Sequence, residues 1–169
     1  MSNTSYFGAT NYYRFFNGND TYETLSSGQN RYSLGNVNMT TIGWSSSENW
    51  QLYPQSGRIF IRNYDFGSGF QLGISDDSLS TPRLMIQSGE LGQQWVFSQL
   101  SDSSWQITNE LLGNNTYLQL PTGETRPIMS TNNQTGTHWV VDANESVNVT
   151  DTTMLSDVPN LEVRDLSLN

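Results

Sequence analysis

The stretch QQWVFSQL, from Gln93 to Leu100, places a tryptophan at the head of an alternating run, directly behind the turn-like SGELG. Two further tryptophans lie at almost constant spacing from it. Trp50, in SSENWQLYP, lies 45 residues before Trp95, and Trp139, in GTHWVVDA, lies 44 residues after it. Alternation with a period of two is typical of a β-strand, because successive side chains there point to opposite faces. The three tryptophans therefore predict one strand that recurs three times.

A second marker recurs at a matching period ahead of each tryptophan. The segments NYYRFFN, GRIFIRN and SWQITN share an alternating apolar pattern that ends in asparagine, and their corresponding positions are 46 residues apart. Two independent markers with one period predict an internal repeat of about 45 residues. The marker residues are Tyr13, Phe15 and Asn17, then Ile59, Ile61 and Asn63, then Trp105, Ile107 and Asn109.

Two more short strands are expected in each repeat between these markers. The candidates for the second strand are RYSLGN, GFQLGIS and TYLQLP, and those for the third are MTTIGW, RLMIQ and RPIMST. Gly, Asn, Ser and Thr interrupt every window of helical length, so the whole chain is predicted to be all-β. In the first repeat, GNDTYETLSSGQN is expected to be a surface loop inserted between the first and second strands, with a two-strand hairpin inside it as an alternative.

One repeat of this size cannot bury its apolar face alone, so three repeats are expected to share a core. The predicted core contains Trp50, Trp95 and Trp139 together with the apolar marker residues. We expect a single domain over residues 11–143, with repeats at about 11–56, 57–102 and 103–143. Residues 1–10 are expected to form an N-terminal segment, and residues 144–169 an acidic, partly ordered tail.

Charge and composition exclude several classes of partner. The 169 residues contain 16 acidic side chains, seven arginines and no lysine, and the net charge of −9 disfavours nucleic acid and anionic membrane surfaces. No apolar run approaches the roughly 20 residues of a membrane-spanning helix. Seven Asn-x-Ser/Thr sites, where chance would supply about four, favour a secreted glycoprotein at an extracellular or cell-surface location. A membrane anchor elsewhere in a full-length protein is compatible with this expectation.

Catalytic and metal chemistry have little support. The absence of cysteine excludes disulfides and thiolate metal sites. His138 is the only histidine and lies inside the Trp139 motif, which disfavours a hydrolase triad. Adjacent carboxylates do not indicate a glycosidase, whose two carboxyl groups face each other across a cleft. The sequence therefore predicts a protein that is not an enzyme and has no cofactor and no metal.

Three repeats of four strands, each ending in a Gln-x-Trp-like motif, resemble the ricin B-type lectins, which are β-trefoils with pseudo-threefold symmetry. The likeness runs from about Tyr12 to Asp142. More specifically, the chain resembles fungal extracellular ricin B-like domains. The motif is literal at Gln93-Gln94-Trp95 and degenerate at Glu48-Asn49-Trp50 and Thr137-His138-Trp139.

The resemblance implies a sugar site in which an aspartate of the second strand grips hydroxyl groups and an aromatic at the end of the third strand stacks on the sugar. The positions that appear to match the aspartate are Gly35, Gly73 and Gln119, none of them acidic. The aromatic is retained only at Trp44, since the other repeats have Ser88 and Thr131. The expected carbohydrate site residues are therefore Trp44, Glu48, Asp76 and Asp77. The structural alternatives are a partly buried Trp44 that covers the core and a solvated Asp76–Asp77 turn.

The function that the resemblance implies is a non-enzymatic carbohydrate-binding module that recognises a glycan or a cell-surface glycoprotein. The missing aspartates keep a second class open, a protein-binding trefoil such as a protease inhibitor.

Overall fold

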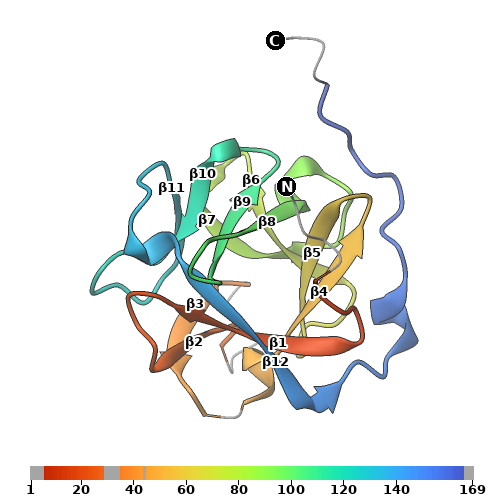
Figure 1. Ribbon diagram of the computed structural model, residues 1–169. Coiled ribbons are helices and arrows are strands. Elements are labelled where there is room, and N and C mark those ends of the chain that lie inside the picture. The colour runs from red at the N-terminus through yellow and green to blue at the C-terminus, as the bar shows by residue number, and fades with distance from the viewer. Residues whose placement is uncertain (1–5, 29–34, 44, 166–169) are drawn as a thin grey trace.

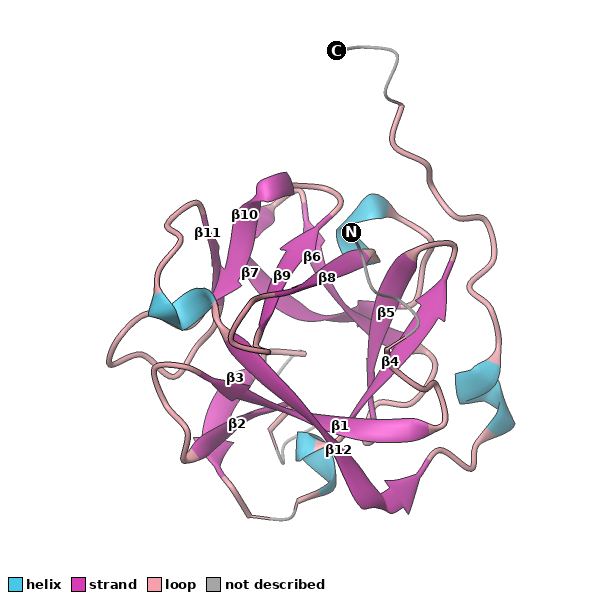
Figure 2. Ribbon diagram, in the orientation of Figure 1, coloured by secondary structure: helices cyan, strands magenta, loops and turns pink. Residues whose placement is uncertain are grey.

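Twelve β-strands and four short 3-10 helices make up residues 6–28, 35–43 and 45–165, which this computed structural model describes (Figures 1 and 2). The first repeat contains β1 (Asn11–Asn17), β2 (Glu23–Ser26), β3 (Asn38–Thr41) and β4 (Trp50–Gln55). The second contains β5 (Arg58–Asn63), β6 (Phe70–Ser75), β7 (Ser78–Ile86) and β8 (Trp95–Gln99). The third contains β9 (Trp105–Asn109), β10 (Gly113–Gln119), β11 (Ile128–Ser130) and β12 (Trp139–Asn148). A 3-10 helix precedes the last strand of each repeat, and a fourth follows β12: η1 (Ser46–Glu48), η2 (Leu91–Gln93), η3 (Thr135–Thr137) and η4 (Thr152–Leu155).

The first and last strands of the three repeats close into a six-stranded antiparallel barrel. Strand β1 pairs with β4 and β12, β5 pairs with β4 and β8, and β9 pairs with β8 and β12. The second and third strands of each repeat form the hairpins β2–β3, β6–β7 and β10–β11. A barrel of six strands with three equivalent hairpins is a β-trefoil, so the predicted all-β class and threefold repeat are confirmed.

Each of the three repeat tryptophans has the same surroundings. Trp50, Trp95 and Trp139 have no exposed surface. In each repeat the indole Nε1 donates a hydrogen bond, at 2.8–2.9 Å, to the carbonyl oxygen of a leucine in the second strand, namely Leu25, Leu72 and Leu118. A buried indole N–H requires such a partner. The tryptophan therefore joins the hairpin of its repeat to the barrel in three equivalent places.

The three marker asparagines, which we call the asparagine clamps, connect neighbouring repeats. Asn17, Asn63 and Asn109 are buried, and each Oδ1 accepts a hydrogen bond from the backbone N–H two residues later, which closes a turn. Each Nδ2 donates to a carbonyl oxygen in the 3-10 helix of the adjoining repeat, on Gly136, Ser47 and Gly92 at 2.8, 3.0 and 2.8 Å. Because Asn17 contacts Gly136, the clamps also join the first repeat to the third.

All the apolar residues predicted for the core are buried. Their exposed fraction is at most 5% for Tyr13, Phe15, Trp50, Ile59, Ile61, Trp95, Trp105, Ile107 and Trp139. Phe7, which precedes β1, is also buried and places its ring 4.8 Å from that of Trp105 and 5.2 Å from that of Phe97, measured between centroids. The segment ahead of the first repeat thus contributes a side chain to the core.

The prediction for the second strand of the first repeat was wrong. That strand is β2, inside the stretch expected to be an inserted surface loop, and it pairs with β3 instead of forming a hairpin of its own. Leu25 carries the same contact to a tryptophan as its two counterparts, and Thr24, Ser26 and Ser27 are buried. Most of RYSLGN lies outside the described residues, and Gly35, with φ of 78°, lies in a turn. The extra residues of this repeat therefore fall between β2 and β3.

Beyond β12, residues 149–165 pack along the outside of the barrel beside β4 and β5 (blue in Figure 1). We call them the C-terminal segment. Met154 and Val158 are each 2% exposed. The fully buried Arg62 of β5 donates to the carbonyl oxygens of Met154 at 2.7 Å and Ser156 at 3.2 Å, and its guanidinium lies 4.5 Å from the ring centroid of Tyr53. Burial lowers the pKa of Arg62, so these carbonyl contacts matter for holding its charge. The C-terminal segment is therefore part of the folded domain.

Candidate functional site

The three positions that correspond to the family aspartate expose no carboxylate. Each of these positions comes directly after the leucine that accepts the hydrogen bond of the repeat tryptophan. The residues there are Ser26, Gly73 and Gln119. Gly73 and Gln119 were predicted, whereas Gly35 was assigned in place of Ser26 because the second strand of the first repeat was misplaced. Ser26 is 2% exposed and Gln119 is 7% exposed. A carboxylate grip of the usual family kind is thus missing from all three repeats.

At Gly73 a larger side chain would meet the side chain of Gln93 and the backbone of Gly92. A Cβ atom there would lie 2.8 Å from Cγ of Gln93 and 3.0 Å from the carbonyl oxygen of Gly92. Gln93 fills this space and makes three hydrogen bonds: its Oε1 accepts from Gln71 and from the backbone of Ser88, and its Nε2 donates to Ile86. The glutamine of the Gln-x-Trp motif is therefore a structural residue that ties η2 to the β6–β7 hairpin.

Glu48 occupies the position of Gln93 in the first repeat. It is 1% exposed, its Oε1 accepts a 2.8 Å hydrogen bond from the backbone of Gly43, and its Oε2 lies 3.7 Å from Nε of Arg14. A carboxylate buried in this way cannot reach a ligand at the surface in this conformation, so the role in sugar binding expected for Glu48 does not fit its placement. Trp44, its expected partner, lies outside the described residues.

Asp76 and Asp77 form the exposed two-residue turn between β6 and β7. The carboxylate of Asp77 accepts a hydrogen bond from Ser75 and lies 3.8 Å from the guanidinium of Arg83. The hydroxyl of Ser75, with a smaller effect of Arg83, lowers the pKa of Asp77. These contacts are those of a solvated turn, and they leave both carboxylates at the surface.

A shallow hollow of about 630 Å³ lies along the same hairpin, beside β7. We call it the aromatic hollow, because Phe66 and Phe70 line it with their rings edge to face and their centroids 5.4 Å apart. Phe70 is 36% exposed, and its cross-strand partner Ile86 is 77% exposed. The hollow therefore presents an apolar platform to solvent, which the motif analysis did not identify.

Polar groups line the same hollow. Arg83 belongs to β7, and Gln87, Ser88 and Glu90 follow its end. Ser88 was identified in the sequence as the counterpart of the family's stacking aromatic, and its place in this hollow shows that the third-strand end does reach a concave surface. The arrangement combines aromatic rings with a guanidinium, an amide, a hydroxyl and a carboxylate, which together can bind an amphipathic, hydroxyl-rich ligand.

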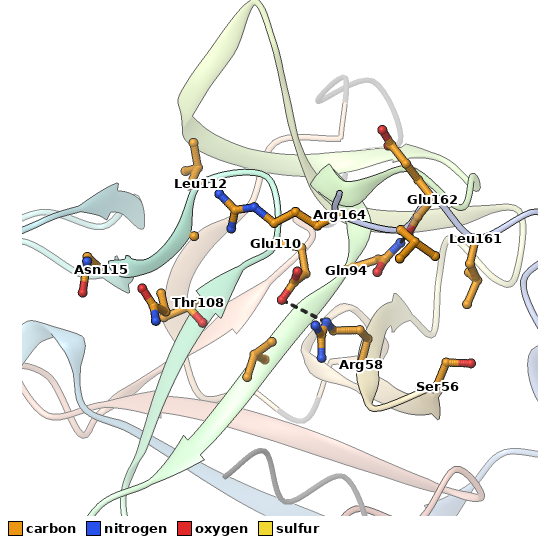
Figure 3. A pocket seen from close by; sticks show the side chains of 14 residues that line it. Ser56, Arg58, Gln94, Thr108, Glu110, Leu112, Asn115, Leu161, Glu162 and Arg164 are labelled. Carbon is orange, nitrogen blue, oxygen red and sulfur yellow. Dashed lines mark hydrogen bonds and ion pairs between the residues drawn. The ribbon is translucent and has the colours of Figure 1, made fainter. Parts of the chain in front are cut away.

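A second hollow of about 740 Å³ lies where the C-terminal segment crosses the barrel, and we call it the C-terminal groove (Figure 3). Its floor is built from β8 and β9 with the start of β10, and residues 161–164 form one side. The segment is held there by Gln94, whose Nε2 donates to the carbonyl oxygen of Glu162 at 2.8 Å, and by the Glu162 backbone N–H, which donates to Gly89 at 2.8 Å. Arg58 and Glu110 meet inside the groove, with Nε and Oε1 2.9 Å apart.

The described part of the chain contains neither a metal centre nor a membrane-spanning helix. Within residues 6–28, 35–43 and 45–165, no three His, Cys, Asp or Glu side chains gather closely enough to hold a metal ion. No helix in that part of the chain is long and apolar enough to cross a bilayer. His138 is half-buried with Nδ1 3.2 Å from Asp102 Oδ2 on the outside of the barrel, so the single histidine forms a surface pair.

Comparison with known proteins gives no sequence match: no family model and no curated protein matches the chain. Solved structures do match. ThreeFoil, a designed threefold symmetric protein, matches 77% of this chain over 96% of its own at 18% identity and a TM-score of 0.66. A Polyporus squamosus lectin, solved with the epitope Neu5Acα2-6Galβ1-4GlcNAc, matches 81% of this chain over 50% of its own at 18% identity and a TM-score of 0.65.

Matches to larger proteins cover only part of them. The chain spans 17% of a mosquitocidal holotoxin, at 17% identity and a TM-score of 0.68. It spans 32% of a GlcNAcα1-4Gal-releasing endo-β-galactosidase from Clostridium perfringens, at 15% identity and a TM-score of 0.66. At these identities the comparisons establish the fold alone. The chain is thus a β-trefoil whose structure matches ricin B-like lectin domains.

Proposed function

We propose that this protein is a non-enzymatic carbohydrate-binding module and that the aromatic hollow is its sugar site. The observation that carries the proposal is the meeting of exposed phenylalanine surface with guanidinium, amide, hydroxyl and carboxylate groups in one hollow of about 630 Å³. Its partner would be a glycan or a glycoprotein on a cell surface. The exposed Asn114, Asn133 and Asn148, each in an Asn-x-Ser/Thr site, support an extracellular setting for such an encounter.

The chemistry of the hollow suits a sugar. The C–H face of a pyranose is apolar and stacks on aromatic surface, which Phe70 provides with Phe66 behind it. The hydroxyl groups on the rim of the ring would then be bound by Glu90 and Gln87, and a carboxylate acceptor makes the stronger, charge-assisted bonds. Because the hollow is shallow and contains few such groups, a single site would bind a monosaccharide with a dissociation constant of about a millimolar.

The absent aspartates favour an acceptor from a different part of the repeat. Because Gly73 carries no side chain, a ligand on this hairpin would be held from the third strand and the residues that follow it. The same absence is the observation that favours the second candidate, a protein-binding trefoil. In that case the exposed Phe70 and Ile86 would contact a protein.

A glycan array with two matched variants tests the proposal. Phe70→Ala removes the aromatic platform, whereas Tyr22→Ala removes an aromatic that is 81% exposed and lies outside the hollow. We expect the wild-type protein and Tyr22→Ala to bind the same glycans, and Phe70→Ala to bind them at least about tenfold more weakly. Thermal melts of all three proteins verify that each is folded.

Two results would contradict the proposal. Equal glycan binding by Phe70→Ala would remove the hollow as the site. If the folded wild-type protein bound none of a diverse set of glycans, the protein-binding function would replace the sugar-binding one.

A further inference from the structure

The C-terminal groove is a second concave site that the aromatic hollow does not explain. It is larger, it lies between the second and third repeats, and one of its sides is the C-terminal segment (Figure 3). It has no aromatic lining among the described residues. Its lining instead combines aliphatic side chains, Val96, Leu112, Leu161 and Val163, with polar and charged groups.

Charged side chains of both signs line this groove: Arg58 and Arg164 with Glu110 and Glu162. The chain has seven arginines against 16 acidic residues, and two of the seven, Arg58 and Arg164, line the groove. Arg14 and Arg62, by contrast, are buried and bound within the fold. Arg58 is paired with Glu110, and the carboxylate of Glu162 accepts from the backbone of Leu91, so Arg164 is the guanidinium of the groove that can meet an anion.

Arg164 is available for a ligand. Its guanidinium makes no hydrogen bond or ion pair with any residue in the described part of the chain, and it lies over Gly113, where a Cβ would be 3.3 Å from one terminal nitrogen. Figure 3 shows the side chain reaching from the C-terminal segment across the groove towards Leu112. Arginine presents a planar fork of donors that matches a carboxylate.

The Arg58–Glu110 pair supplies a different group. With side chains 34% and 15% exposed, the pair is partly buried and is held by the 2.9 Å contact between Nε and Oε1. The other carboxylate oxygen of Glu110 has no hydrogen-bonding partner among the described residues, so it can accept from a hydroxyl. Thr108 and Asn115 add a hydroxyl and an amide beside it (Figure 3).

We propose that the C-terminal groove binds an acidic sugar, a pyranose that carries a carboxylate. Arg164 binds the carboxylate, Glu110 and Thr108 bind ring hydroxyls, and Leu112 and Val96 contact the apolar C–H groups. The C-terminal segment thereby contributes to recognition as well as to the fold. This site is separate from the aromatic hollow, and neither proposal depends on the other.

A titration of the full chain, followed through backbone amide NMR signals, tests this inference. D-glucuronate is the probe, D-glucose is its neutral match, and acetate is the carboxylate alone. We expect glucuronate to shift the amides of Gly113 and Glu110 saturably, with a dissociation constant of about a millimolar, and both other compounds to bind at least about fivefold more weakly.

Two arginine variants test whether Arg164 binds the carboxylate of glucuronate. Arg164→Gln should weaken glucuronate binding about fivefold or more. Arg126→Gln makes the same change in net charge at an exposed position that bonds to Asn36, away from the groove, and should leave binding unchanged. Phe70→Ala should also leave it unchanged.

Four results would overturn the inference. They are the absence of saturable shifts at Gly113 and Glu110, equal binding of glucuronate by the Arg164→Gln and Arg126→Gln proteins, equal binding of glucose or acetate, and loss of glucuronate binding in Phe70→Ala. The last result would assign glucuronate to the aromatic hollow.

Discussion

Replacing Asn109 with alanine tests whether the asparagine clamps hold the three repeats together. Asn109 is 1% exposed; its Nδ2 donates to Gly92 at 2.8 Å and its Oδ1 accepts from the backbone of Leu111 at 3.0 Å. Alanine would leave both backbone groups without these partners, and each such loss costs about 1–3 kcal/mol. The free energy of unfolding should therefore fall by about 2–4 kcal/mol, which for a domain of this size lowers the melting temperature by roughly 5–15 °C.

Urea unfolding followed by tryptophan fluorescence measures this loss, because all three repeat tryptophans are buried. The matched control is Asn114→Ala, the same change at an exposed position five residues further along the chain. The corresponding changes at Asn17 and Asn63 should cost similar amounts, since their contacts are equivalent. If Asn109→Ala lost no more than about 0.5 kcal/mol relative to Asn114→Ala, the clamps would be incidental and the argument from threefold equivalence would fail.

Three further predictions concern stability. Trp95→Ala removes a fully buried indole and its bond to Leu72, at a cost of about 3–5 kcal/mol, so the variant should show no cooperative thermal melt; a cooperative melt near the wild-type temperature would contradict this. Glu48→Ala removes the buried carboxylate that faces Arg14 and should cost about 3 kcal/mol in chemical denaturation, whereas a change below about 1 kcal/mol would show that the pair is dispensable. Hydrogen bonds from Ser104 and Thr153 lower the pKa of Asp102 and Asp151 below the ordinary value of 3.8. The two carboxylates therefore stabilise the fold above that pH, and this contribution is lost as acid protonates them in the folded state. Melting temperatures measured against pH should decline below about pH 4, and a decline that begins near pH 6 would point to another group.

The repeat and its core could be predicted because they depend on spacing. The tryptophans and the asparagine markers recur at 44–46 residues, and each occupies a position whose hydrogen bonds are fixed by the backbone of the same or the adjoining repeat. Such positions tolerate few residue types, so they remain visible in the sequence. The side chains between them face solvent or differ between repeats, and for that reason they carry a weaker pattern.

The second strand of the first repeat was misplaced although the spacing between its leucine and the repeat tryptophan identifies it. Leu72 and Leu118 precede their tryptophans by 23 and 21 residues, and Leu25 precedes Trp50 by 25. Leu34 of RYSLGN precedes it by only 16, although its local sequence looks more like GFQLGIS. The spacing between the leucine and the tryptophan of each repeat therefore favours Leu25 as the second-strand residue.

The candidate sites were harder to predict than the core. Glu48 and Gln93 each precede a repeat tryptophan by two residues. Both side chains make buried hydrogen bonds because η1 and η2 turn them inwards, and no pattern in the sequence predicted these 3-10 helices. Phe66 and Phe70 lie in one short stretch, DFGSGF, but this stretch does not reveal that Phe70 pairs with Ile86 at the base of the hairpin and stays exposed. The C-terminal groove depends on a segment without any repeat, so no internal comparison could reveal it.

The pairing of β1 with β12 affects when this protein can fold as it is synthesised. The first strand remains without its longest partner until Asn148 has left the ribosome, because Asn11 to Asn17 align with Trp139 to Asn148. The contact between Asn17 and Gly136 spans 119 residues and is subject to the same delay. Contacts of such sequence separation slow folding. The nascent chain must therefore stay open and shielded from aggregation until almost the whole domain has been translated.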